Sequence, residues 1–232
     1  MLDPGKAARA VAAAVCAAAL AAACGSSDDP PDPPDGGLIT VTTMRGALLQ
    51  PAEIGPTWQP PATSPDPNLL VPLCGGPATA PPVPPGAEVV ASPLVDEGTS
   101  GAQTLTQTAL VYPDATGAQA GLAALRALAD TCPATVNQQA QTTNDRNEPA
   151  YAETAKTTGM NEGGWTGFVI VRHKAYEPRH PGIADTAVVV VSRRNVVLVD
   201  SYAVYRLGTA STGPQFDSDW KKLVGTVLNR VA

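Results

Sequence analysis

Residues 186–205 read TAVVVVSRRNVVLVDSYAVY, two valine-rich runs on either side of a short polar segment. β-Branched residues at this density favour strands, and the polar residues 192–195 predict a tight turn in which Asn195 takes a positive φ. Three further runs have the composition or the two-residue period of strands: 103–112, 165–174 and, more weakly, 151–157. The sequence therefore predicts an antiparallel sheet of four or five strands.

Two segments carry the apolar period of an amphipathic helix. Asp114 is placed to cap the first segment, which ends at Pro133 and directs Leu125, Leu128 and Cys132 toward the core. The second spans residues 217–231, with Asp217 or Ser218 as its cap. Its apolar positions follow the i, i+3, i+4, i+7 pattern: Trp220, Leu223, Val224, Val227, Leu228 and Val231. This stripe packs on the sheet or, alternatively, binds a partner. The fold class expected is α+β, an antiparallel sheet packed against a middle helix and a C-terminal helix.

Proline is concentrated in the N-terminal third of the chain. Seventeen of the 24 prolines lie between Pro30 and Pro93, so this third is expected to be rich in loops. Residues 44–54 have the pattern of two short helical turns, separated at Pro51. Residues 60–85 are expected to form a long surface loop that is pinned at Cys74.

The first 23 residues have the pattern of a secretory signal peptide. Lys6 and Arg9 precede an apolar run of Ala, Val and Leu that is too short to span a membrane. The run ends in LAAAC at residues 20–24, which resembles a bacterial lipobox. Cys24 would then become the acylated first residue of the mature protein; the alternative is cleavage that leaves Cys24 as a free thiol.

A spacer separates this start from the domain. Residues 25–37 read GSSDDPPDPPDGG and cannot bury apolar surface, so residues 24–43 are expected to be a lipidated cysteine and linker before a domain at 44–232. The expected location is the extracytoplasmic face of the cell membrane, with two or more acyl chains as the anchor. The net charge of −6 does not provide the basic surface that nucleic acid requires.

Two cysteines remain in the expected domain, Cys74 and Cys132. Outside the cell the default for such a pair is a disulfide. The alternatives are two reduced buried thiols or a catalytic thiol, although neither cysteine has a histidine or a basic cluster beside it in sequence.

Five short features occur together in a familiar order: residues 48–55 (LLQPAEIG), 73–75 (LCG), the Ala-rich segment ending at Cys132, 193–197 (RRNVV) and the C-terminal periodic segment. With them, residues 44–232 resemble the actinobacterial sensor-domain lipoproteins and are similar to the extracellular sensor domain of a mycobacterial receptor Ser/Thr protein kinase. The resemblance implies an α+β fold with an antiparallel sheet, a concave cleft and structural disulfides. The kinase sensor has two disulfides, whereas this chain can form one. The chain has no Gly-rich phosphate loop and no catalytic-loop motif of a kinase.

The most varied side chains lie in residues 173–180, HKAYEPRH, between two expected strands. His173, Tyr176, Glu177 and His180, together with Tyr202, are candidates for a ligand-contacting rim; for the loop the alternative is an ordinary solvated surface, and for Tyr202 it is core packing. The spacing matches no metal motif, and no G-x-S-x-G nucleophile is present. We therefore expect no metal, no cofactor and no catalysis.

The function expected is that of a membrane-anchored extracytoplasmic lipoprotein with a ligand-binding or sensing domain. Its ligand, of unknown identity, would lie on the concave face of the sheet. The alternative is a structural or protein-interaction module of the cell envelope.

Overall fold

The computed structural model describes residues 37–98, 101–143, 146–208 and 213–231. Residues 38–232 form one unit. The signal-peptide, Cys24 and most of the linker predictions fall outside the described residues. The elements in chain order are α1 (Val41–Ala47), α2 (Pro51–Ile54), β1 (Glu88–Gly98), β2 (Gly101–Val111), α3 (Ala115–Ala129), β3 (Thr135–Gln138), β4 (Gln141–Thr143), β5 (Arg146–Glu148), β6 (Tyr151–Glu162), β7 (Trp165–Tyr176), β8 (Gly182–Arg193), β9 (Val196–Leu207) and α4 (Gly213–Arg230).

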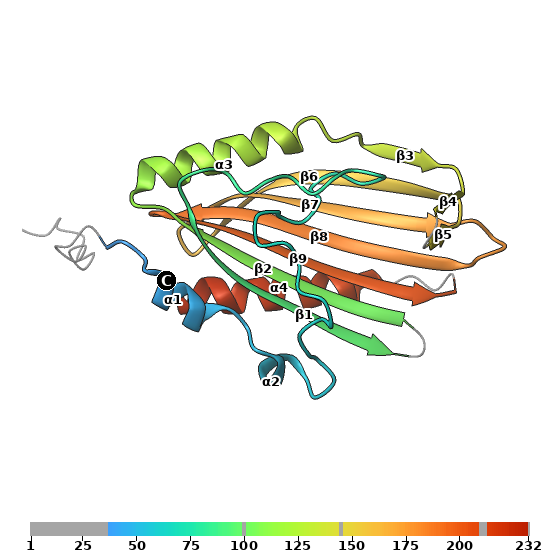
Figure 1. The fold of residues 1–232 in the computed structure, drawn as a ribbon, viewed down its shortest axis with the longest axis horizontal. Coiled ribbons are helices and arrows are strands. Elements are labelled where there is room, and N and C mark those ends of the chain that lie inside the picture. Colours follow the sequence, from blue (N-terminus) through green and yellow to red (C-terminus); the bar gives the residue numbers. More distant parts are fainter. Residues whose placement is uncertain (1–36, 99–100, 144–145, 209–212, 232) are drawn as a thin grey trace, which may run out of the picture. The chain divides into compact units, whose positions relative to one another are not determined.

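Seven strands form one antiparallel sheet in the order β1-β2-β9-β8-β7-β6-β3 (Figure 1). The five predicted strands are all present. β1 and β3 were not predicted, because Pro93 interrupts the first pattern and the second is short and polar. β4 and β5 pair only with each other.

The β8–β9 hairpin is confirmed, but its turn chemistry differs from the prediction. Arg194, not Asn195, has the positive φ, at 52°. Asn195 is buried instead, and its side-chain amide donates hydrogen bonds to the carbonyls of Ile39 and Tyr112. Its side-chain oxygen accepts from the Ile39 N–H at 2.7 Å, so this one residue ties the start of the domain to the hairpin.

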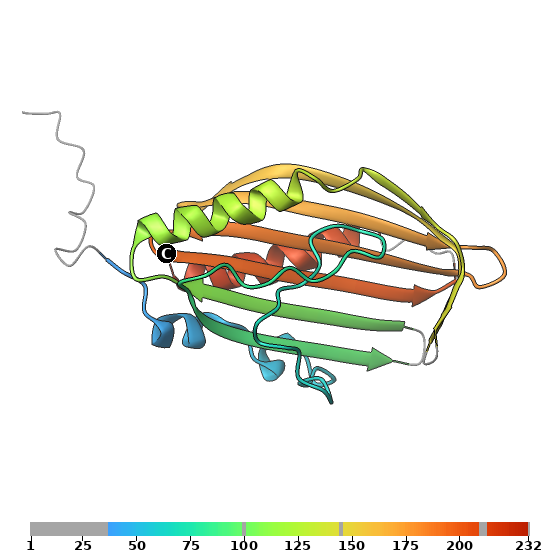
Figure 2. The ribbon, with the colours of Figure 1, turned by 45° about the horizontal axis from the view of Figure 1, so that its top comes forward.

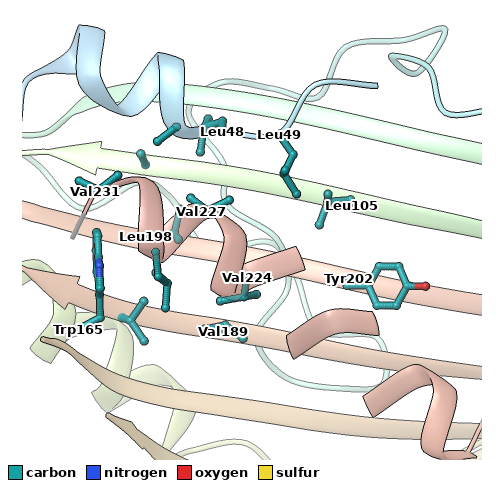
Figure 3. Packing of buried hydrophobic residues seen from close by; sticks show 14 of the residues in the cluster. Leu48, Leu49, Leu105, Trp165, Val189, Leu198, Tyr202, Val224, Val227 and Val231 are labelled. Atoms are coloured by element: carbon teal, nitrogen blue, oxygen red, sulfur yellow. The ribbon is translucent and has the colours of Figure 1, made fainter. Parts of the chain in front are cut away.

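Helices cover both faces of the sheet (Figure 2). On the face that we call the α3 face, α3 packs over Phe168, Ile170, Val188, Val190, Val197 and Val199. The opposite face, which we call the α4 face, is covered by α4 and α1. There, residues from five strands and both helices form the larger of the two apolar clusters. Figure 3 shows part of this cluster. The α+β class with a middle helix and a C-terminal helix on an antiparallel sheet is therefore confirmed.

The stripe of α4 packs on the sheet as expected, with Val224, Val227 and Leu228 at most 1% exposed. The predicted start was wrong, because the helix begins at Gly213 rather than after an Asp217 or Ser218 cap. Asp217 lies inside the helix and accepts a hydrogen bond from the Trp220 indole N–H at 3.2 Å.

Asp114 caps α3, as predicted, by accepting the Gly117 N–H at 2.8 Å. The prediction that Leu128 faces the core was wrong, since Leu128 is 45% exposed. Ala118, Leu125 and Ala129 follow the seven- and four-residue spacing of one face, and Leu128 is turned to its flank. α3 ends at Ala129, so Cys132 lies just beyond the helix.

Residues 56–87, which we call the arm, contain no ladder strand and pass around the β1 edge of the sheet. Gln59 forms an isolated bridge with Val95 of β1, and further along Leu70 and Leu73 are buried on the α3 face. The Cys74–Cys132 disulfide joins the arm to the end of α3, with Cα atoms 5.0 Å apart. The predicted pinned loop and the predicted disulfide are both confirmed.

Candidate functional site

The α3 face of the sheet changes character along its strands. Beneath α3, the face carries bulky branched residues such as Val188 and Val197. Beyond α3, the same strands present small or polar residues on this face: Gly182, Ala184, Thr186, Ser201 and Ala203. These residues are outside the cluster that packs on α3. We call this region the distal half of the α3 face.

At the end of the distal half lies a pocket of about 650 Å³, which we call the end pocket. It is formed where the β7–β8 turn, the segment after β5 and the end of β9 meet. Its lining residues are Asn147, Glu148, Pro149, Tyr176, His180, Pro181, Tyr205, Leu207 and Gly208. Leu207 is 60% exposed and Tyr205 is 37% exposed, so two large apolar side chains are left open to solvent. Its volume lies within the range of small-molecule sites.

Three tyrosines from three strands meet beside the end pocket. The rings of Tyr176 and Tyr205 are 6.1 Å apart and nearly perpendicular, and those of Tyr151 and Tyr176 are 5.7 Å apart. Gly182 on the intervening strand β8 allows this approach, because a Cβ there would lie 3.2 Å from the Tyr205 hydroxyl. The ammonium group of Lys174 lies 3.9 Å from the centre of the Tyr151 ring, a cation–π contact.

Burial raises the pKa of two members of the tyrosine cluster, Tyr151 and Tyr176, and so favours their neutral hydroxyl groups. Burial, together with the nearby Glu148 carboxylate, raises the pKa of Tyr176 to about 12. Lys174 and Glu148 form an ion pair at 3.4 Å. The pocket therefore offers aromatic faces, neutral hydroxyl donors and a few polar groups at its rim, an arrangement that suits binding and orientation of a ligand.

A buried charge pair holds the disulfide loop against the sheet next to this cluster. The Arg172 guanidinium donates to the Cys74 carbonyl at 2.6 Å, and the Glu153 carboxylate accepts the Gly76 N–H at 2.8 Å. The two charged groups are 3.8 Å apart. At Gly75 a Cβ would lie 2.6 Å from the Glu153 carboxylate, so a glycine is required there.

The five predicted rim residues do not form one surface. Tyr176 and His180 line the end pocket, and Glu177 is hydrogen-bonded to His180 at 3.1 Å. His173 is on the α4 face, where it bonds the Asp185 carboxylate across β7 and β8. Tyr202 is also on the α4 face (Figure 3). Its side chain is 2% exposed, stacks on Phe216 and donates a hydrogen bond to Gln103.

The predicted rim omitted several residues that line the end pocket. The alternation of β9 places Tyr205 and Leu207 on the face opposite to Tyr202. The two-residue period of the strand therefore indicated that Tyr205 and Leu207, if not Tyr202, could share a face with Tyr176. No sequence pattern indicated Asn147, Glu148 and Pro149, which reach the pocket through pairing of β6 with β7.

A second polar centre lies on the α4 face, where Asp200 is 1% exposed. Gln107 donates to one Asp200 oxygen at 3.2 Å and accepts the Leu49 N–H at 2.9 Å. Burial raises the pKa of Asp200 to about 7, and the hydrogen bond from Gln107 opposes that rise. In this part of the protein, the other Asp200 oxygen has no hydrogen-bond partner among the described residues. Asp200 and Gln107 are both buried, and neither lines the end pocket.

Two features are absent from the residues that the structure describes. None of the helices there combines the length and apolar character of a membrane-spanning segment. No cluster of three or more His, Cys, Asp or Glu side chains in these residues has the arrangement of a metal site.

The protein belongs to a class of α+β folds in which a seven-stranded antiparallel sheet carries helices on both faces, here α3 on one face and α1 and α4 on the other. Among solved structures this fold is shared by the extracellular domain of PknH from Mycobacterium tuberculosis, with a TM-score of 0.53 and 17% sequence identity. The match covers 84% of this chain and 97% of that domain. No protein-family model matches the sequence, and no curated protein matches it. The likeness is one of fold, and it agrees with the fold that the sequence resemblance implied.

Proposed function

We propose that this chain is an extracytoplasmic binding domain that takes a small envelope ligand in the end pocket without converting it chemically. The observation that carries the proposal is the exposure of Tyr205 and Leu207 in a pocket of about 650 Å³. A folded domain usually buries such side chains, and an apolar hollow with a polar rim is the usual form of a ligand site. The shared fold with an extracellular domain supports the extracytoplasmic location.

The chemistry of the pocket favours a ring with one flat apolar face and polar edges, as in a sugar unit of an envelope glycan. Tyr205 and Pro181 provide flat apolar surface, while Asn147, Glu148 and His180 provide hydrogen-bonding groups around it. Tyrosines combine a large contact area with a hydroxyl group, so they suit such amphipathic ligands.

The test uses the mature chain made soluble by Cys24→Ser and titrated with soluble oligosaccharides released from the envelope of the producing cells. Binding is measured by calorimetry, and native mass spectrometry identifies any bound species. Tyr205→Ala should weaken binding about tenfold, because the lost ring contact is worth about 1 kcal/mol or more. Leu128→Ala, exposed on α3 outside the pocket, is the matched control. Equal affinity of the two variants, or no saturable binding to wild-type protein, would contradict the proposal.

The membrane anchor is a separate part of the proposal. Acylation of Cys24 would hold the domain at the outer face of the membrane, with residues 25–37 as a spacer. Cys24→Ser should move the protein from the membrane fraction to the soluble extracellular fraction, whereas Cys16→Ser, within the signal peptide, should leave it in the membrane. Membrane retention of Cys24→Ser would contradict the anchor and leave the pocket test unaffected.

A further inference from the structure

The first strand of the sheet has an open edge. β1 pairs with β2 on one side, and on the other side Val95 exchanges two backbone hydrogen bonds with Gln59, at 2.8 and 2.9 Å. In an antiparallel ladder every second residue directs its N–H and C=O to the same side. The register of β1 runs unbroken from Glu88 to Gly98. Val89, Ala91 and Pro93 therefore face away from β2, as Val95 does.

These outward groups have no partner within the described part of the chain. The register directs the backbone N–H and C=O of Val89 and Ala91 away from β2, and outside the strand ladder no backbone hydrogen bond joins them to a described residue. Ala91 is exposed. Pro93 has no N–H to leave unpaired. Proline usually occurs in edge strands at such positions, where an N–H would point away from the sheet. The open edge therefore runs from Glu88 to Ser92 and is closed beyond it by Pro93 and the Gln59–Val95 bridge.

A hollow lies on each side of this edge. The first, of about 370 Å³, is lined by Arg45, Leu48 and Gln50 beside residues 89–92. The second, of about 430 Å³, lies between the arm and the sheet. Its walls are mostly apolar and include Val89, Ala91, Pro93, Leu69 and Val71. An added strand would direct alternate side chains to the two sides, one set toward each hollow.

The charge at the edge selects the partner. Arg45 is exposed and forms no ion pair or hydrogen bond with any described residue. Arg45 lines the hollow on one side of the edge, while the walls of the hollow on the other side are mostly apolar. The matching segment is therefore extended and alternates acidic with apolar side chains. The linker at 25–37 does not match, because its prolines lack the N–H groups that a ladder needs.

We infer that the β1 edge binds an extended segment of a partner protein as an eighth strand. Backbone hydrogen bonds to Val89 and Ala91 provide the attachment, and the two hollows provide selectivity for alternating acidic and apolar side chains. This surface uses no residue of the end pocket, so the inference is independent of the proposed ligand.

The probe is a capped octapeptide of alternating valine and glutamate, titrated into the mature Cys24→Ser chain and followed by amide NMR. Saturable shifts of the Val89 and Ala91 amides are expected. Two further peptides carry N-methyl groups on alternate residues: one on the odd-numbered residues and the other on the even-numbered residues. Because a single edge of the added strand bonds to β1, one methylated peptide should bind and the other should fail. Equal behaviour of the two methylated peptides, or no shift at either amide, would overturn the inference.

Variants locate the surface. Ala91→Pro removes one outward N–H without touching the β2 ladder and should weaken the peptide at least tenfold, while Ala91→Ser keeps the N–H and should bind as wild type. Arg45→Gln should weaken the acidic peptide several-fold and remove most of its salt dependence. Wild-type affinity of Ala91→Pro would overturn the inference. A peptide-free dimer, seen by sedimentation and dissociated by Ala91→Pro, would also overturn it, in favour of a second copy at this edge.

Discussion

The α3 face has two halves made by the same strands, and their side chains differ in kind. Beneath α3, Val188 and Val190 of β8 are completely buried. Further along the same strand and face, Thr186, Ala184 and Gly182 take their place, and the large side chains come from the neighbouring strands, as Arg172 and Lys174 of β7 and Tyr205 of β9. Branched residues give a helix a surface to pack on, whereas small residues leave room above the sheet. The half beneath α3 thus packs on a helix, while the distal half leads to the end pocket, whose walls come from Tyr176, Tyr205 and the segments around the sheet end.

The disulfide should have the largest effect on the half beneath α3. It closes a loop with a sequence separation of 58 and joins the arm to the end of α3. Replacing both cysteines by serine should lower the free energy of unfolding by about 4 kcal/mol, because the unfolded chain loses its cross-link. Urea denaturation measures the change. Reduction of wild-type protein should reproduce it, and a reduced protein as stable as the oxidised one would contradict the assignment.

Truncation on α3 compares two leucines three residues apart. Leu125 is 1% exposed and packs on the covered half, while Leu128 is 45% exposed. Leu125→Ala should cost about 3 kcal/mol in urea denaturation, and Leu128→Ala less than about 0.5 kcal/mol. Similar losses for both variants would mean that α3 does not cover this half as described.

The covered half was readable from the sequence because its signals are local. The valine runs of β8 and β9 have high strand propensity, the α4 stripe has a clear period, and the two cysteines of the expected domain have one possible pairing. β1 and β3 were missed because proline and polar residues weaken their patterns. Their strand state depends on pairing with β2 and β6, which the residues of β1 and β3 alone do not indicate.

The end pocket was only partly readable, for two different reasons. Strand alternation separates Tyr202 from Tyr205 and His173 from Tyr176, so the odd-even rule could have removed Tyr202 and His173 from the rim. The contribution of Asn147 and Glu148 depends instead on how the segment between β5 and β6 lies against the end of β9. That arrangement is tertiary, and no local pattern encodes it.

The buried carboxyl group of Asp200 should make the stability of the protein depend on pH, unlike the polar residues of the distal half. Asp200 precedes Ser201 on β9 and faces the α4 side, where burial raises its pKa to about 7, from 3.8. The folded protein therefore keeps the proton in a pH range where the unfolded chain has released it. Stability should fall as the pH rises from about 4 through 7, by roughly 2 to 3 kcal/mol between pH 5 and pH 8. Urea denaturation across this range measures the slope.

Two variants, each of which replaces a carboxylate by an amide, test whether Asp200 causes this pH dependence. Asp200→Asn keeps an acceptor for Gln107 and should remove most of the pH dependence, raising stability at pH 8. Glu97→Gln, an exposed carboxylate on β1, should leave the slope unchanged. A slope that survives Asp200→Asn would assign the dependence to other groups.

The smallest effect on stability is expected at the open end of the distal half. Leu207 is 60% exposed, so Leu207→Ala removes little buried surface and should change the free energy of unfolding by less than about 0.5 kcal/mol. The same variant should reduce the fluorescence of a hydrophobic dye bound to the folded protein, because Leu207 is part of the exposed apolar surface of the end pocket. Leu125→Ala should show the opposite pattern, with a large loss of stability and unchanged dye binding below its unfolding transition. If Leu207→Ala were as destabilising as Leu125→Ala, Leu207 would belong to the packed core and the two halves would not differ in this respect.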